Sequence, residues 1–99
     1  MKKILIIEDE KGILMSLKDE FELQGYIVHT AEEGERGLKL ARERKPDLII
    51  LDIMLPVLDG YEVCRKLRME GDTTPVIMLT VKDKEADKVL GLGLGQTIM

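Results

Sequence analysis

The sequence predicts an α/β fold in which parallel strands are joined by helices that cover both faces of a sheet. Short apolar runs without polar alternation, as at residues 4–7 and 48–51, indicate strands that are buried on both sides. Each run is followed by a segment with apolar residues at helical spacing, which glycine or proline ends. Because strand and helix alternate along the whole chain, parallel strands with right-handed crossovers are favoured.

Each element follows from the same patterns. The four predicted strands span residues 4–7, 26–30, 48–51 and 75–79. A predicted helix follows each strand, with its apolar residues three or four positions apart. These inward-facing residues are Ile13, Leu14, Leu17 and Phe21, then Leu38 and Ala41, then Tyr61, Val63, Cys64 and Leu67, and finally Ala86, Val89 and Leu90. Gly25 and Pro46 end the first two helices.

Length and composition limit the classes of protein that this chain can form. Its 99 residues correspond to one domain, and 44% of them are apolar, which is enough for a core. The net charge of −4 argues against a nucleic-acid-binding surface, because phosphate backbones are held by an excess of lysine and arginine. A single cysteine favours a reducing compartment, and the apolar runs are too short to span a membrane. We therefore expect a cytoplasmic domain without a membrane partner.

Polar side chains follow three of the predicted strands at the point where each strand ends. Glu8 and Asp9 follow the first strand, Asp52 follows the third, and Thr80 follows the fourth. Ligands of open parallel sheets bind beyond the carboxyl ends of the strands. If the first and third strands are neighbours, the three acids converge and repel one another, and a divalent cation such as Mg²⁺ relieves that repulsion. A carboxylate beside Mg²⁺ can accept a phosphoryl group as an acyl phosphate.

Three stretches of the sequence together resemble the receiver domain of two-component response regulators. They are Glu8-Asp9, residues 48–60 with the sequence LIILDIMLPVLDG, and residues 75–80 with the sequence PVIMLT. The resemblance runs in register from Met1 to about Gly95. Residues 83–95 are especially similar to the subfamily that carries a winged-helix DNA-binding domain.

The resemblance implies a flavodoxin-like, doubly wound parallel sheet with the strand order 2-1-3-4. It also implies that Asp52 accepts a phosphoryl group from a sensor histidine kinase, in a signalling domain that is not an enzyme. Mg²⁺ is then bound by Asp9, Asp52 and the backbone carbonyl of Met54, with Glu8 acting through water, and Thr80 is the switch hydroxyl. The chain itself is not expected to bind nucleic acid, although relatives carry a DNA-binding domain.

The sequence departs from the family pattern near its end. The lysine and proline that follow the fifth strand in relatives fall beyond Met99, and residues 96–99 replace the usual lead into that strand. We therefore expect a receiver domain over residues 1–99 that is truncated before the fifth strand and fifth helix. An exposed edge of the fourth strand would favour a homodimer or a swapped oligomer, with residues 91–99 rearranged into a strand or a helix extension.

Three functions remain open on the sequence alone. The first is a phosphoacceptor in phosphorelay signal transduction. The second is a non-catalytic, self-associating receiver fragment whose switching is impaired because the lysine is missing. The third is a Mg²⁺-dependent phosphohydrolase on a similar sheet; it ranks last because it usually needs a second acid two residues after the nucleophile, where Met54 stands here.

Overall fold

The computed structural model describes residues 2–79 and 96–98. Along these residues the chain alternates strand and helix as the sequence predicts. The elements are β1 (Lys3–Ile7), α1 (Lys11–Leu23), β2 (Ile27–Ala31), α2 (Gly34–Arg44), β3 (Leu48–Asp52), α3 (Gly60–Met69), β4 (Val76–Leu79) and β5 (Gln96–Ile98). The helix predicted around Ala86 and Leu90 lies outside the described residues.

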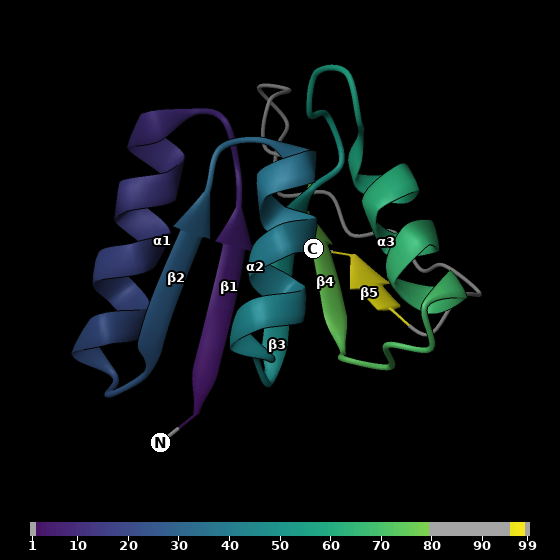
Figure 1. The fold of residues 1–99 in the computed structure, drawn as a ribbon. Coiled ribbons are helices and arrows are strands. Elements are labelled where there is room, and N and C mark those ends of the chain that lie inside the picture. The colour runs from purple at the N-terminus through teal and green to yellow at the C-terminus, as the bar shows by residue number, and fades with distance from the viewer. Residues whose placement is uncertain (1, 80–95, 99) are drawn as a thin grey trace.

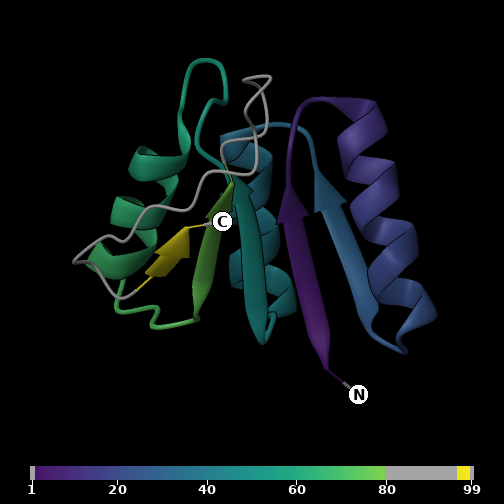
Figure 2. The ribbon, with the colours of Figure 1, turned by 180° about the vertical axis from the view of Figure 1, so that it is seen from behind.

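The strands form one parallel sheet with the order β2-β1-β3-β4-β5, so the predicted order 2-1-3-4 is confirmed. All arrowheads in Figures 1 and 2 point toward the same edge of the sheet. We call this edge, where β1 and β3 end, the carboxyl edge, and the opposite one, where the strands begin, the amino edge. At the carboxyl edge Ile7 lies beside Leu51, so the residues that follow β1 lie next to the end of β3.

The core is divided between the two faces of the sheet because successive strand residues point in opposite directions. One cluster joins Leu5, Ile49 and Met78 to buried residues of α2 and α3 such as Leu38 and Leu67. A second cluster packs the alternate strand residues, Ile4, Ile6, Ile50 and Leu79, against Leu14 of α1. Thus α2 and α3 cover one face and α1 covers the other, and this arrangement fixes the positions of the strand ends.

The expectation that no fifth strand follows is corrected at residues 96–98. Gln96, Thr97 and Ile98 form the short strand β5, which pairs in parallel with Val76 to Met78 of β4. The unsatisfied peptide groups along the edge of β4 favour such pairing, and the β-branched Thr97 and Ile98 suit an extended backbone. For residues 96–98 this agrees with the expected rearrangement into a strand; residues 91–95 and 99 lie outside the described residues. Within the described residues, every helix is too short or too polar to cross a bilayer.

Candidate functional site

Three carboxylates meet at the carboxyl edge of the sheet. Glu8 directly follows β1, Asp9 comes next, and Asp52 is the last residue of β3. One carboxylate oxygen from each residue lies within 4.8 Å of those of the other two. The predicted convergence of these acids is therefore confirmed, and it follows from the pairing of β1 with β3.

Two of these carboxylates are completely buried. Glu8 and Asp52 are each 0% exposed, whereas Asp9 is half-buried. Backbone amides orient both buried groups: the Glu10 N–H donates to Oε2 of Glu8 over 2.8 Å, and the Met54 N–H donates to Oδ1 of Asp52 over 3.0 Å. The two side chains are therefore held in place by the loops that follow their own strands.

The electrostatics of Asp52 reflect this crowding. Burial raises the pKa of its carboxyl to about 7, and the negative charge of Glu8 and a hydrogen bond with Glu8 act in the same direction. The hydrogen bond from Met54 opposes these effects because it stabilises the ionised form. Without a cation, ionising Asp52 beside Glu8 is thus unfavourable, and a positive charge placed between the acids would reverse this.

A close approach of α3 to the end of β3 fixes the backbone around Asp52. A Cβ atom on Gly60 would lie 2.6 Å from the carbonyl oxygen of Asp52, so only glycine fits there. The Gly60 N–H also donates to the carbonyl of Ile53 over 3.0 Å. Next to it, Asp59 caps α3 by accepting a hydrogen bond from the Glu62 N–H over 2.9 Å. Asp59 and Gly60 therefore have a structural role near the cluster.

The loop after Glu8 is ordered by a cap that the sequence analysis missed. The carboxylate of Glu10 accepts hydrogen bonds from the N–H groups of Gly12 and Ile13, over 2.9 and 3.1 Å, at the start of α1. Glutamate is not among the preferred N-cap residues, so the residue type at position 10 did not predict a helix cap. The cap holds the backbone that carries Asp9 between β1 and α1.

Two predicted site residues remain, Met54 and Thr80. Met54 lies in the turn after β3, where its N–H contacts Asp52 and its side chain is 60% exposed. Thr80 lies outside the described residues. β4 ends at Leu79, which is opposite Asp52 in the register of the sheet. The roles of the Met54 carbonyl and the Thr80 hydroxyl stay predictions.

A shallow hollow lies beside Asp9, where β2 and α2 meet the carboxyl edge. Besides Asp9, its lining residues are Thr30, Ala31, Glu32, Glu33, Arg36 and Pro56. The sequence analysis did not predict a role for the residues that line this hollow beside Asp9. They could have been found from the end of β2, because Ala31 pairs with Ile7 and so lies next to the acids. The hollow extends the polar surface of the site away from β3.

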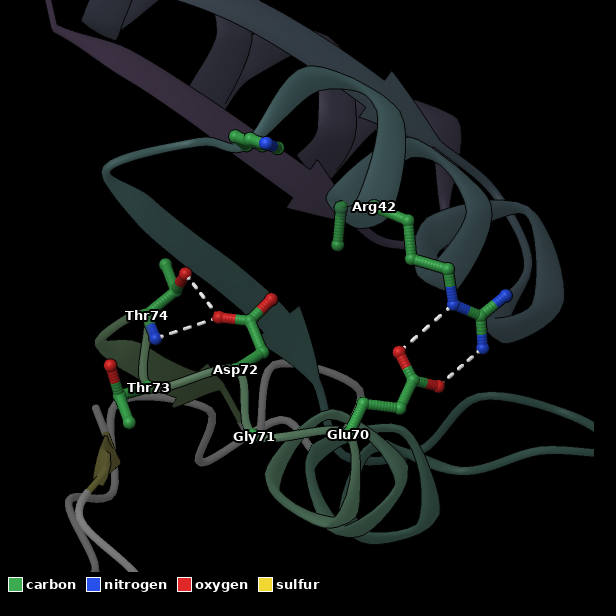
Figure 3. Close-up of a pocket in the computed structure, with 8 residues that line it drawn as sticks. Arg42, Glu70, Gly71, Asp72, Thr73 and Thr74 are labelled. Atoms are coloured by element: carbon green, nitrogen blue, oxygen red, sulfur yellow. Dashed lines mark hydrogen bonds and ion pairs between the residues drawn. The ribbon is translucent and has the colours of Figure 1, made fainter.

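A second hollow lies at the amino edge, between the ends of α2 and α3 (Figure 3). There Arg42 forms a two-pronged ion pair with Glu70, with nitrogen–oxygen distances of 3.0 and 2.5 Å. Asp72 accepts hydrogen bonds from the N–H and the hydroxyl of Thr74. The Arg42 guanidinium lowers the pKa of Glu70 through these hydrogen bonds. The charges here are exposed and compensated, unlike those around Asp52.

The sequence matches the family model described as "Response regulator receiver domain" over residues 4–98. It is 55% identical over 94 residues to the alkaline phosphatase synthesis transcriptional regulatory protein PhoP of Bacillus subtilis, covering 95% of this chain and 39% of that protein. It is 48% identical over 95 residues to the transcriptional regulatory protein AfsQ1 of Streptomyces coelicolor, covering 96% and 42%. The chain thus spans about two fifths of the length of these curated relatives.

Solved structures show the same likeness. The response regulator TrrA of Thermotoga maritima, in complex with Mg(2+)-BeF, aligns with a TM-score of 0.75 at 40% identity, covering 79% of this chain and 68% of that one. The chemotaxis protein CheY4 of Vibrio cholerae aligns with a TM-score of 0.82 at 31% identity, covering 99% and 83%. The matched residues, the sheet order and the three acids agree: this chain belongs to the response regulator receiver domain family.

Proposed function

We propose that this chain accepts a phosphoryl group on Asp52 in phosphorelay signalling, with Mg²⁺ as the required cation. The observation that carries the proposal is the set of three carboxylates whose oxygens lie within 4.8 Å of one another, two of them fully buried. A protein gains no stability from placing two acids together away from water, so such a cluster favours a functional role.

The residues present fit Mg²⁺. The cation would be held by Asp9, Asp52 and the backbone carbonyl of Met54, with Glu8 acting through a water molecule. Mg²⁺ prefers oxygen ligands and is usually bound by one or two carboxylates together with water. The raised pKa of Asp52 indicates a position where a cation is strongly favoured. The similar protein TrrA was solved in complex with Mg(2+)-BeF, which supports this assignment.

Asp52 is the proposed nucleophile. One of its carboxylate oxygens forms the new bond to phosphorus while the bond between phosphorus and the donor breaks, and the donor atom keeps that electron pair. When bound, Mg²⁺ supplies positive charge that offsets the charge of the phosphoryl oxygens. The Met54 N–H restricts the rotation of the Asp52 carboxylate, and Gly60 fixes its backbone, so the nucleophile is already oriented.

The remaining roles are carried over from the family. A sensor histidine kinase is the proposed donor, and Thr80, which follows the last residue of β4 in the sequence, is the proposed switch hydroxyl. Because the curated relatives are transcriptional regulators of about two and a half times this length, control of transcription by a DNA-binding domain is proposed only for the whole protein. The receiver itself is proposed to act as a non-enzymatic signalling domain in the cytoplasm.

The test is an intact-mass measurement after incubation with acetyl phosphate and Mg²⁺. We expect an adduct of one phosphoryl group that is lost in alkali, as acyl phosphates are. The adduct should be absent from the Asp52→Asn variant and from samples with a chelator. The matched control, Asp19→Asn, removes an exposed carboxylate on α1 and should keep the adduct. An adduct on Asp52→Asn, or none on the unmodified chain, would contradict the proposal.

A further inference from the structure

The loop between β1 and α1 carries two of the three acids and connects the carboxyl edge of the sheet to the first helix (Figure 1). Glu10 is the last residue of this loop, directly after Asp9 and before the first residue of α1. Its side chain is exposed, and its carboxylate is not one of the three that meet at the site. The proposed cation site therefore does not use the Glu10 carboxylate as a ligand.

Glu10 forms hydrogen bonds in two directions. Toward the site, its N–H donates to Oε2 of the buried Glu8 over 2.8 Å. Toward the helix, its carboxylate accepts hydrogen bonds from the N–H groups of Gly12 and Ile13 over 2.9 and 3.1 Å. Its carbonyl also accepts a hydrogen bond from the Leu14 N–H over 3.0 Å. One residue thus joins a buried acid of the site to the first turn of α1.

Both ends of the loop are attached to fixed parts of the fold. Leu14, in the first turn of α1, is 4% exposed and belongs to the core cluster that contains Ile6 of β1. At the other end, the Glu8 N–H donates to the carbonyl of Ala31 in β2 over 3.0 Å. Asp9 lies between these two attachments. Its backbone is therefore held from β2 on one side and, through Glu10, from α1 on the other.

We propose that Glu10 is a positioning residue that sets the affinity of the acidic cluster for Mg²⁺. The inference rests on the proposed function, in which Asp9 binds the cation and Glu8 acts through water. When the cap orders the loop in advance, cation binding does not have to offset the loss of backbone freedom. Without the cap, the cation itself must order the loop, and its affinity falls. Residues that orient metal ligands from outside typically change metal affinity about 10- to 100-fold.

The negative charge of Glu10 is a second way in which this residue attracts Mg²⁺. Because the side chain is exposed, salt screens that attraction. The two contributions are removed by different substitutions. Any neutral side chain removes the charge, but only a side chain without a hydrogen-bond acceptor removes the cap. Asparagine is neutral and is among the strongest N-cap residues, whereas alanine is neutral and does not cap.

The experiment measures Mg²⁺ binding by calorimetry for the unmodified chain, Glu10→Ala and Glu10→Asn. We expect Glu10→Ala to bind Mg²⁺ about fivefold or more weakly than the unmodified chain, because the loop loses its cap. Glu10→Asn should stay within about twofold of the unmodified chain, because it keeps the cap and loses only a screened charge. The matched control is Glu20→Gly, at an exposed position near the other end of α1. It should lower the midpoint of chemical denaturation without changing the Mg²⁺ affinity.

A second readout separates positioning from damage to the reaction. In Glu10→Ala, the Mg²⁺ concentration that gives half-maximal phosphorylation by acetyl phosphate should rise by the same factor as the Kd for Mg²⁺. The rate at saturating Mg²⁺ should equal that of the unmodified chain, because Asp52 and its hydrogen bond from Met54 are intact.

Three results would overturn the inference. Equal losses of affinity in Glu10→Ala and Glu10→Asn would assign the effect to charge. An unchanged affinity in Glu10→Ala would show that the cap does not position the acids. An equal loss in Glu20→Gly would assign the effect to the general stability of α1. If the unmodified chain binds Mg²⁺ but is not phosphorylated, the proposed function fails, and the comparison of affinities still decides the role of Glu10.

Discussion

The charged side chains at the two edges of the sheet have opposite environments. At the amino edge, Arg42 and Glu70 form an ion pair on the surface, with both side chains well exposed to solvent. At the carboxyl edge, Glu8 and Asp52 are buried together and carry charge of the same sign. An exposed ion pair changes the stability of the folded state little, because water screens both charges. Two buried charges of the same sign destabilise the folded state strongly. The contrast supports the proposed cation site at the carboxyl edge, whereas the charges of the amino edge compensate one another.

The largest effect that tests this contrast is the pH dependence of stability without divalent cations. The pKa of Asp52 is raised to about 7 in the folded chain, from 3.8 in the unfolded one, so the folded state binds the proton more tightly. The free energy of unfolding should therefore rise as the pH falls from 8 to 5, by about 2 to 3 kcal/mol. Urea denaturation in chelator at several pH values measures this.

Two comparisons sharpen that measurement. In Asp52→Asn the increase in the free energy of unfolding toward low pH should largely disappear, because the titrating carboxyl is gone. Adding Mg²⁺ should also reduce it, because the cation favours the ionised carboxylate. A free energy of unfolding that falls over the same pH range in chelator would show that the carboxyl edge is not electrostatically strained.

The next effect concerns the backbone that supports Asp52. Gly60→Ala would place a methyl group 2.6 Å from the Asp52 carbonyl oxygen and 2.8 Å from the Cα of Ile53, and neither backbone atom can move easily. We expect a loss of about 2 kcal/mol of stability. The control is Gly12→Ala, where the added methyl meets only the end of the Glu10 side chain at 3.3 Å. If both variants lose the same stability, the close packing of α3 on β3 is unimportant.

The smallest effect is expected at the amino edge. Glu70→Gln weakens the ion pair with Arg42 between α3 and α2 but leaves a hydrogen-bonding side chain in place. Because both partners are exposed, the change in the denaturation midpoint should be close to the resolution of the experiment and smaller still at high salt. Phosphorylation of Asp52 should be unaffected. A marked loss of phosphorylation would mean that the two edges are coupled.

The strands and helices that alternate along the chain were predictable from the sequence. The apolar runs identified β1 to β4, and helical spacing identified α1 to α3. Once the strand order was known from the family resemblance, Glu8 and Asp52 had to meet, because residues that follow neighbouring parallel strands share one edge. This part of the site depends only on order and register, which short sequence motifs encode.

Other features depend on contacts that the sequence does not encode locally. Arg42 and Glu70 are 28 residues apart and have no motif in common. Val57 adopts a conformation that its own side chain disfavours, so the surrounding loop determines it. The strand β5 has only three residues, too few for a pattern to identify it, and its pairing depends on the edge of β4. In each case tertiary context overrides local preference.

The most direct test of the account is a calorimetric titration of the chain with Mg²⁺. We expect one bound ion, with affinity reduced about tenfold or more in Glu8→Gln and in Asp9→Asn. The control Asp72→Asn, at the amino edge, should bind Mg²⁺ like the unmodified chain. Equal affinity in all four proteins, or no heat of binding in any of them, would contradict the proposal that the acids of the carboxyl edge form a magnesium site.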